Sequence, residues 1–464
     1  MSIQYHSTRG SAPHLDMRGV TLTGLAADGG LYVPKTWPEF SIPEIVALKD
    51  KPYTDIAQKI LWPFVNSSMT DVELRRLLQE AYSKFDHPEI TPLKQLSDRH
   101  WVMELFHGPT LAFKDIALQL VGGVFEHFLS QNNQRMTVVG ATSGDTGSAA
   151  MMALAHRKNI DVFILYPSKG PSDIQRKQMT CIEAPNVHAM AIDGSFDDCQ
   201  AIVKALFNDA KLRAKYSLGA VNSINWLRIL AQMVYYFVAS ARFGDKPLSF
   251  VVPTGNFGNI YSAYAAMKSG LSISKLGVAS NLNDILTRFF AQGQMKAEGV
   301  HYTLSPSMDI QVSSNFERLL FDLYNEKGEA VKNLMAQLQK EKEFQVTQVQ
   351  LAMARQVFSA ARATNEQTIT TIQDVYKESG YVLDPHSAVG VACARMMEKE
   401  LPDPIISLAC AHPAKFPETI QRAIGVNPVL PPLVAELIRK PERQASLPAD
   451  IGAVEKFISE RVRL

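Results

Sequence analysis

The sequence places a lysine at the point where a turn enters an apolar helix. Gly108-Pro109-Thr110 breaks regular structure within the stretch His107 to Asp115, and apolar residues then repeat at helical spacing from Ile116 to Phe125. Lys114 is therefore predicted in the first helical turn. The positive end of the helix dipole and the apolar neighbours both favour its neutral amine, which carbonyl addition requires. The ordinary alternative is a solvated lysine at a helix start.

Two glycine-rich turns further along each join a predicted strand to a predicted helix. The first, Ser143 to Gly147, precedes a helix predicted from Ser148 to His156, and the second, Thr254 to Asn259, precedes one from Ile260 to Lys268. Backbone N–H groups at such turns bind anions, and the second turn favours a phosphate. Neither turn has the Walker or Rossmann spacing, so nucleotide binding has little support. Each turn could also be a plain connection.

Composition and charge are those of an ordinary globular chain. Its 464 residues are 46% hydrophobic and 20% charged, enough for about three domains and a large core. The net charge is +1 and no basic block stands out, so nucleic acid is not an expected partner. The most apolar long segment, Ile224 to Phe243, is interrupted by Arg228, Gln232 and Arg242. It predicts a buried core helix and no membrane span.

The chain divides into a helical opening and a longer alternating part. Thr70 and Glu73 have capping-box spacing, and an apolar face that includes Val72 continues to Phe85, so residues 1 to about 95 are predicted to be mainly helical. Glu326 to Gln350 is predicted to be an exposed helical insertion. Beyond residue 100, apolar runs alternate with helical segments, which predicts parallel sheets with helices on both faces and ligands at the carboxyl ends of strands. The candidate strands are Val138–Thr142, Val162–Tyr166, Val187–Ile192, Phe250–Pro253, Leu276–Ala279 and Ile405–Cys410.

Together the lysine stretch and the two glycine turns resemble the threonine synthase family, pyridoxal-phosphate enzymes of the tryptophan-synthase-β-like fold (fold type II). The resemblance covers nearly the whole chain. It implies an α/β fold with an N-terminal domain at residues 1–95 and a catalytic region at 96–464, made of two α/β subdomains with the cofactor between them. Further matching segments are Tyr5–Gly10, Asp28–Pro34, Asn222–Trp226, Asn281–Asp284, Ser305–Ile310 and Ala411–Phe416.

The resemblance also implies roles for particular residues. Lys114 would carry pyridoxal 5'-phosphate covalently and act as the catalytic base, and Asp145 would lie near the 3-hydroxyl of the cofactor. A turn aspartate that caps the next helix is an equal alternative for Asp145. The remaining cofactor-binding residues would be Gly255, Asn256, Phe257, Gly258, Asn259 and Cys410, and the loop for the substrate carboxylate would include the substrate-binding residues Ser143, Gly144 and Thr146. For the substrate phosphate, composition adds the substrate-binding candidates Arg176 and Asn225 and the further candidates Lys169, Ser172, Lys177 and Arg288; each is at least as readily a structural or solvated group.

The activity that the resemblance implies is a lyase reaction of threonine biosynthesis. O-phospho-L-homoserine and water would give L-threonine and phosphate by γ-elimination and β-addition of water. One alternative is a phospho-lyase of the same fold that leaves 2-oxobutyrate, and another is a non-catalytic metabolite-binding relative. The small-molecule substrate would be the main partner, and the oligomeric state, monomer or homodimer, is left open.

The cysteines bear on the compartment and on the cofactor. None of the four shows metal-ligand or redox spacing, so we expect reduced thiols, no metal and a cytoplasmic location. We also expect no signal peptide, because family-like residues begin at Tyr5. Cys410 departs from the family, in which a threonine hydroxyl usually meets the pyridine nitrogen; a packing cysteine is the alternative. Lys415 is the one rival to Lys114 and, like His412, has no defined role.

Overall fold

The chain folds into two units, each built around a parallel sheet. The structure, a computed structural model, describes residues 3–463. The first unit comprises Met1–Leu78, His87–His107 and Ser223–Pro428, and the second comprises Gln79–Asp86, Gly108–Asn222 and Val429–Leu464. The predicted domain boundary near residue 95 is a division along the sequence, and it stays a prediction.

The first unit is centred on a six-stranded sheet in the order β13-β10-β9-β14-β4-β3. All neighbours are parallel except β3, which pairs antiparallel with β4. The strands of the unit are β1 (Tyr5–Ser7), β2 (Tyr32–Pro34), β3 (Leu93–Gln95), β4 (His100–Glu104), β9 (Leu248–Pro253), β10 (Ile273–Ser280), β11 (Gln294–Lys296), β12 (Glu343–Gln345), β13 (Phe358–Arg362) and β14 (Ile405–Ala409). Of these, β1 pairs with β2 and β11 with β12 in two separate two-stranded sheets.

Helices cover both faces of this sheet, because alternate side chains of a strand point to opposite sides. Val251 of β9 packs with α17, whereas the preceding residue, Phe250, points to the opposite face and meets the ring of Tyr236 on α10. The helices are α1 (Met17–Thr23), α2 (Ile42–Val46), α3 (Tyr53–Val65), α4 (Asp71–Tyr82, whose last turn counts with the second unit), α10 (Trp226–Phe243), α11 (Gly258–Lys268), α12 (Ile285–Gln292), α13 (Phe316–Leu323), α14 (Gly328–Glu341), α15 (Gln348–Val357), α16 (Asn365–Ser379), α17 (Pro385–Met396) and α18 (Pro417–Ile424), with 3-10 turns η1 (Pro306–Met308) and η2 (Pro413–Lys415).

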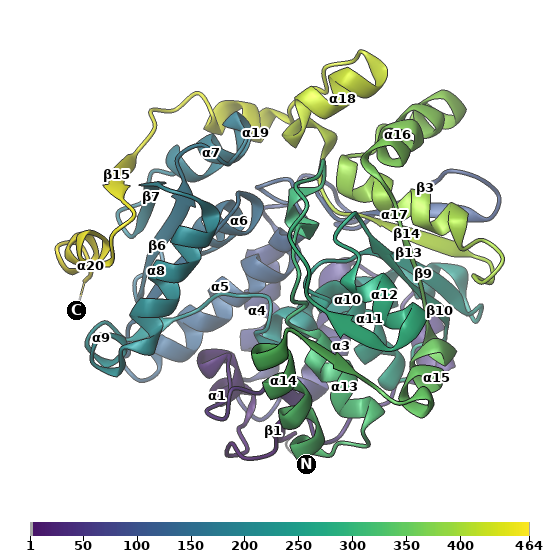
Figure 1. Cartoon of the computed structure of the whole chain (residues 1–464), viewed down its shortest axis with the longest axis horizontal. Helices are drawn as coiled ribbons and strands as arrows, with labels where there is room; N and C mark the ends of the chain where they lie inside the picture. The colour runs from purple at the N-terminus through teal and green to yellow at the C-terminus, as the bar shows by residue number, and fades with distance from the viewer. Residues whose placement is uncertain (1–2, 464) are drawn as a thin grey trace. The chain divides into compact units, whose positions relative to one another are not determined.

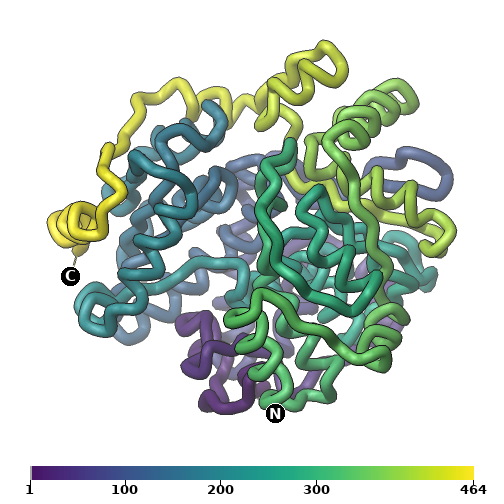
Figure 2. Tube along the Cα trace, in the orientation of Figure 1, coloured from purple at the N-terminus to yellow at the C-terminus, as the bar shows by residue number. Residues whose placement is uncertain are grey.

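The second unit has a five-stranded sheet in the order β15-β7-β6-β5-β8, parallel throughout. Figures 1 and 2 show the yellow C-terminal segment returning to place β15 beside β7. Its strands are β5 (Met136–Ala141), β6 (Ile160–Pro167), β7 (Val187–Asp193), β8 (Leu218–Gly219) and β15 (Gln444–Pro448); its helices are α5 (Lys114–Ser130), α6 (Asp145–Leu154), α7 (Asp173–Thr180), α8 (Phe196–Asn208), α9 (Ala210–Lys215), α19 (Pro432–Leu437) and α20 (Ile451–Ser459).

The predicted class of fold, parallel sheets flanked by helices behind a mainly helical N-terminal region, is confirmed. The capping box is also present, with Glu73 accepting from the Thr70 backbone at 2.7 Å. Three details differ. Val72 lies off the apolar face and is 75% exposed, and the helix predicted from Ser148 begins at Asp145. The insertion from Glu326 to Gln350 is only partly helical, because it also contains β12.

In each unit, loops that carry candidate site residues follow the carboxyl ends of strands. In the first unit β9 ends just before the turn at Thr254, and β14 ends at Ala409, one residue before Cys410. The predicted strand had included Cys410. In the second unit β5 ends at Ala141, before the other glycine turn. No helix among residues 3–463 is long and apolar enough to span a bilayer.

Candidate active site

Lys114 is the first residue of α5, as predicted, and a tight turn holds it there. The carboxylate of Asp115 accepts hydrogen bonds from the backbone N–H and the hydroxyl of Thr110, both at 2.8 Å. A Cβ on Gly108 would lie 2.4 Å from Cβ of Asp115, so only glycine lets the turn close. Asp115 is fully buried. The start of α5 is therefore built to keep Lys114 in one place.

The lysine side chain is buried beside a carboxylate. Lys114 is 8% exposed, and its Nζ lies 3.4 Å from Oδ2 of Asp145 and 4.9 Å from the centre of the Phe113 ring. A carboxylate at this distance stabilises the charged ammonium and so opposes the two effects that favour the neutral amine. The pairing joins residues far apart in the sequence, and sequence reasoning did not predict it.

Asp145 is held from its other side by Gln175, a residue that sequence reasoning missed. The amide Nε2 of Gln175 donates to Oδ1 of Asp145 at 2.9 Å, and its Oε1 accepts from the Ser172 backbone at 3.0 Å. Asp145 is the first residue of α6, and Gly144 is its N-cap. Gly144 leaves room for the amide, since a Cβ there would lie 2.7 Å from the Gln175 Cδ. The signal in the sequence was the capping-box spacing of Ser172 and Gln175.

The first glycine turn is ordered by a threonine behind it. Oγ1 of Thr142 accepts from the backbone N–H of Gly144 at 3.0 Å and of Gly147 at 2.9 Å. Within residues 3–463 the N–H groups of Ser143 and Thr146 make no hydrogen bond. They lie at the N-terminal end of α6, where the helix dipole favours an anion.

The second glycine turn has a row of unused donors. No backbone N–H from Gly255 to Ile260 makes a hydrogen bond to any part of the described chain, residues 3–463. The carbonyl oxygens of the same turn are occupied, that of Gly255 by the Ser313 hydroxyl at 2.7 Å and that of Asn256 by the Asn315 backbone at 3.1 Å. Donors without acceptors at the start of α11 make an anion site.

Phe257 and Asn259 fix the shape of this turn. Phe257 has a left-handed backbone with φ of 61°, and its ring packs edge-on against Phe316 at 5.0 Å. Oδ1 of Asn259 accepts from the hydroxyls of Tyr235 and Tyr236, at 2.5 and 2.8 Å. Its Nδ2 is buried without a partner among the described residues. The side-chain amide of Asn259 therefore adds a buried donor to those of the turn.

Arg228 is a second functional candidate that sequence reasoning missed. It is 5% exposed, and its Nε and Nη1 have no hydrogen-bond partner within residues 3–463. Arg228 precedes Tyr235 by two turns on α10, so the two side chains lie on the same side of the helix. Tyr235 contacts Asn259 on that side. Burial lowers the pKa of the guanidinium to about 10, which leaves it charged at neutral pH. A buried cation with unused donors calls for an anionic ligand. The signal was a charge inside an otherwise apolar helix.

Cys410 lies at the end of β14, buried and held by its backbone. Its N–H donates to Oγ of Ser387 at 2.9 Å, and its Sγ lies 3.8 Å from the carbonyl oxygen of Leu408. Burial raises the pKa of the Tyr236 hydroxyl, and Cys410 adds to that shift. Its predicted role at the pyridine nitrogen stays a prediction.

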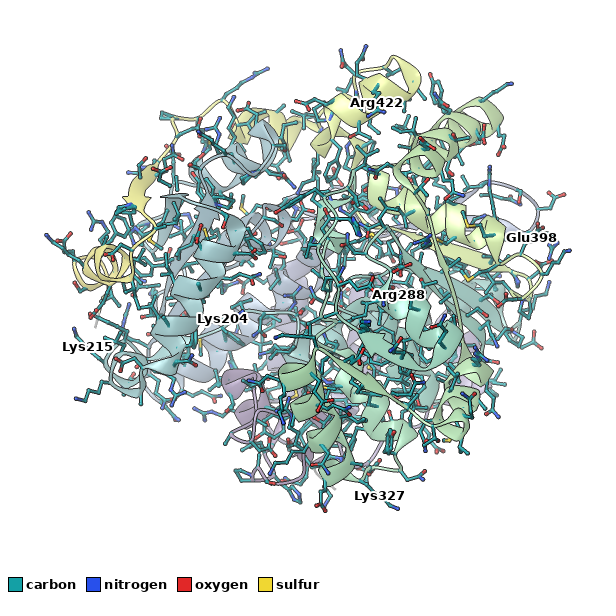
Figure 3. The ribbon with its side chains drawn as sticks, in the orientation of Figure 1. Lys204, Lys215, Arg288, Lys327, Glu398 and Arg422 are labelled. Atoms are coloured by element: carbon teal, nitrogen blue, oxygen red, sulfur yellow. The ribbon has the colours of Figure 1, made fainter. Side chains whose placement is uncertain are left out.

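Most of the remaining predicted residues have structural partners. Arg176 pairs with Asp173 and Glu442, and Lys177 with Asp173 at 3.2 Å. Asn225 is buried, caps α10 by accepting from the Leu227 N–H and donates to the Thr21 carbonyl. Arg288, labelled on α12 in Figure 3, pairs with Asp284 and Glu298. The hydroxyl of Ser172 caps α7, Lys169 is exposed, and Lys415, the rival lysine, is fully buried in η2 near His412.

Known protein families match most of the chain. Residues 4–82 match the family described as "Threonine synthase N terminus", residues 85–336 the family described as "Pyridoxal-phosphate dependent enzyme", and residues 387–458 the family described as "Threonine synthase, C-terminal". The three matches follow one another along the chain without overlap.

Individual proteins match over their full length. The threonine synthase of Pseudomonas aeruginosa is 46% identical over 461 residues, covering 99% of this chain and 98% of that protein. The pyridoxal-phosphate-bound threonine synthase structure from Brucella melitensis is 46% identical with a TM-score of 0.97 and 100% coverage of both chains. The yeast threonine synthase structure is 40% identical with a TM-score of 0.94, covering 99% of each.

Proposed function

The chain belongs to the threonine synthase family of pyridoxal-phosphate-dependent enzymes, and from that premise we propose how its own residues serve the reaction. The reaction converts O-phospho-L-homoserine and water into L-threonine and phosphate. We propose that Lys114 carries the cofactor and moves the protons. The cytoplasmic location stays a prediction from the cysteine spacing.

The residues of the candidate site fit pyridoxal phosphate. A dianionic phosphate needs several donors and no competing acceptor, which is what the N–H groups from Gly255 to Ile260 offer. The aldehyde needs an amine that is buried and held in place, as Lys114 is at the start of α5. We therefore assign the phosphate of the cofactor to the Gly255–Asn259 turn and its covalent attachment to Lys114.

Lys114 is also the group that moves protons. When bound, pyridoxal phosphate supplies an electron sink that makes protons on the neighbouring substrate carbons acidic. The Nζ of Lys114 can accept a proton in its amine form and return it in its ammonium form, so it acts at Cα and then at Cβ. Asp145, 3.4 Å away, stabilises the ammonium between these steps.

The substrate's two anionic ends need separate partners. We assign the carboxylate to the Ser143–Gly147 turn, where the N–H groups of Ser143 and Thr146 are unused and the start of α6 favours a negative charge. We assign the leaving phosphate to Arg228, whose buried guanidinium has unused donors. The predicted roles of Arg176 and Asn225 carry less support, because their described contacts already serve the fold.

The proposal rests chiefly on the buried Lys114–Asp145 pair at the entrance to α5, because an internal amine with a carboxylate partner is equipped for proton transfer. Incubation with O-phospho-L-homoserine tests it. We expect one L-threonine for each phosphate released and no accumulation of 2-oxobutyrate. Phosphate accompanied by 2-oxobutyrate alone would instead establish the phospho-lyase activity, and cofactor binding without any product would point to a metabolite-binding protein.

Gln175 is expected to matter through Asp145. Gln175→Met keeps the length of the side chain but removes the 2.9 Å hydrogen bond that orients the carboxylate. We expect kcat/KM to fall about tenfold to a hundredfold, equivalent to about 1.4 to 2.7 kcal/mol, the range for a buried hydrogen bond to a charged group. Gln337→Met, at an exposed glutamine on α14, is the matched control and should leave steady-state kinetics unchanged. Equal activity of the two variants would remove Gln175 from the site.

Cys410 is expected to tolerate a hydroxyl but not a carboxylate. Cys410→Thr should keep activity within about tenfold, or roughly 1.4 kcal/mol, because it restores a neutral partner of similar size. Cys410→Asp would favour a protonated pyridine nitrogen and change how the reaction divides between threonine and side products. The measurement is threonine formed per phosphate released. If the Asp variant matches the wild type in rate and in this ratio, Cys410 only packs.

A further inference from the structure

A short segment, residues 313–315, hydrogen-bonds to the side of the Gly255–Asn259 turn that carries its carbonyl groups. The hydroxyl of Ser313 donates to the Gly255 carbonyl at 2.7 Å, and that of Ser314 donates to Oδ1 of Asn256 at 3.1 Å. Asn315 binds the Asn256 carbonyl twice, from its backbone at 3.1 Å and from Nδ2 at 3.0 Å. Because the carbonyl groups are held on this side, the N–H groups of the turn are left to face a ligand.

Asn315 is in turn held by a fully buried arginine. Arg318 is 0% exposed, and its guanidinium donates to Oδ1 of Asn315, to the Ile224 carbonyl at 2.7 Å and to the Tyr32 carbonyl at 3.1 Å. Asn315 also donates to the Ser223 carbonyl at 3.1 Å. Arg318 thus ties the phosphate turn to the start of α10 and to β2 through planar, directional contacts.

The acceptors of Arg318 are all uncharged, which is unusual for a buried cation. The adjacent carboxylate of Glu317 is engaged elsewhere, with Arg9 at 2.9 Å and Thr8 at 2.7 Å. The rings of Trp226 and Tyr261 lie 5.7 and 5.9 Å from the guanidinium carbon. Burial lowers the pKa of Arg318 to about 10, so it stays charged at neutral pH. Its charge, to which no carboxylate within residues 3–463 is hydrogen-bonded, adds to the attraction of the turn for a phosphate dianion.

We propose that Arg318 and Asn315 are positioning residues that hold the Gly255–Asn259 turn in its phosphate-binding shape before the cofactor arrives. This inference rests on the proposed assignment of the cofactor phosphate to that turn. A preformed site loses less entropy on binding, so the benefit should appear as affinity for the phosphate group. The affinity for the ring and aldehyde of the cofactor should not depend on the shape of this turn.

The experiment compares two ligands that differ only in the phosphate. Apoenzyme of the wild type, Arg318→Met and Asn315→Ala is titrated with pyridoxal phosphate and with pyridoxal, and the two Kd values are measured for each protein. We expect Kd for pyridoxal phosphate to rise at least about tenfold in both variants, while Kd for pyridoxal changes less than about threefold. The ³¹P chemical shift of the bound cofactor should also differ from that of the wild type.

An ion pair in the second unit provides the control for general loss of stability. Arg463→Gln breaks the contact with the buried carboxylate of Asp161 at 2.6 Å and should lower Tm without changing the ratio of the two Kd values. If Arg318→Met does not fold, Asn315→Ala decides alone, since it leaves Arg318 in place. If the ratio of the two Kd values in Arg318→Met and Asn315→Ala equals that of the wild type, even with both ligands bound more weakly, the proposal is overturned. A wild type that binds pyridoxal phosphate but forms no threonine would refute the proposed function while leaving this comparison valid.

Discussion

Replacing Lys114 with alanine is expected to abolish threonine formation, lowering kcat by at least about 10⁴-fold, equivalent to about 5.5 kcal/mol. The loss follows because the same Nζ carries the cofactor and moves the protons. Lys114→Arg should be equally inactive, although it keeps a cation beside Asp145, because a guanidinium does not supply a neutral amine.

Two observations accompany the loss of rate. Borohydride treatment of the wild type should bleach the yellow protein and leave the reduced cofactor on the peptide that contains Lys114. Lys177→Ala is the matched control, because that lysine pairs with Asp173 on the surface of α7 and should keep activity within about threefold. A reduced adduct on Lys415, which is also buried, would contradict the assignment.

Replacing Arg228 with methionine is expected to move activity and stability in opposite directions. We expect kcat/KM for O-phospho-L-homoserine to fall at least about a hundredfold, or about 2.7 kcal/mol, because a charge-assisted contact to the leaving phosphate is lost. The free energy of unfolding of the substrate-free protein should stay the same or rise, since a buried guanidinium with unpaired donors is costly.

A lower kcat/KM together with an unchanged or higher free energy of unfolding distinguishes a ligand-binding arginine from a structural one. Arg242→Met, on the same helix, removes an ion pair with Glu89 at 2.6 Å and should change kcat/KM little. A lower unfolding free energy for Arg228→Met together with normal kcat/KM would show that the guanidinium serves the fold. Urea unfolding and steady-state kinetics on the same preparations give both quantities.

The parts of the site that the sequence predicts correctly are those with local causes. Lys114 falls at a helix start because the Gly108-Pro109-Thr110 turn and the apolar spacing behind it are both local. Most core strands are continuous apolar runs and were predicted within a few residues, whereas the interior strand β4, which begins with His100 and ends with Glu104, was missed. Short strands such as β3 and β15 were missed because they lie at sheet edges and are partly exposed, so they lack an apolar run.

The parts that were missed depend on tertiary contacts. The partner of Lys114 is a carboxylate on another helix, and no periodicity relates the two residues. Arg228 and Arg318 look like polar interruptions in amphipathic helices, and only their burial shows that they are unusual. Asn225 matches a family motif, yet its amide caps α10 and binds the Thr21 carbonyl, a use that spacing cannot reveal.

The most direct test of the central claim follows the oxygen atom of water. When O-phospho-L-homoserine reacts in ¹⁸O-labelled water, elimination breaks the bond between Cγ and the ester oxygen, and water adds at Cβ. We therefore expect one ¹⁸O in the hydroxyl group of each L-threonine and none in the phosphate released. Labelled phosphate together with homoserine would mean simple ester hydrolysis, and unlabelled phosphate with 2-oxobutyrate and no threonine would mean elimination alone. Either result would contradict the proposed reaction.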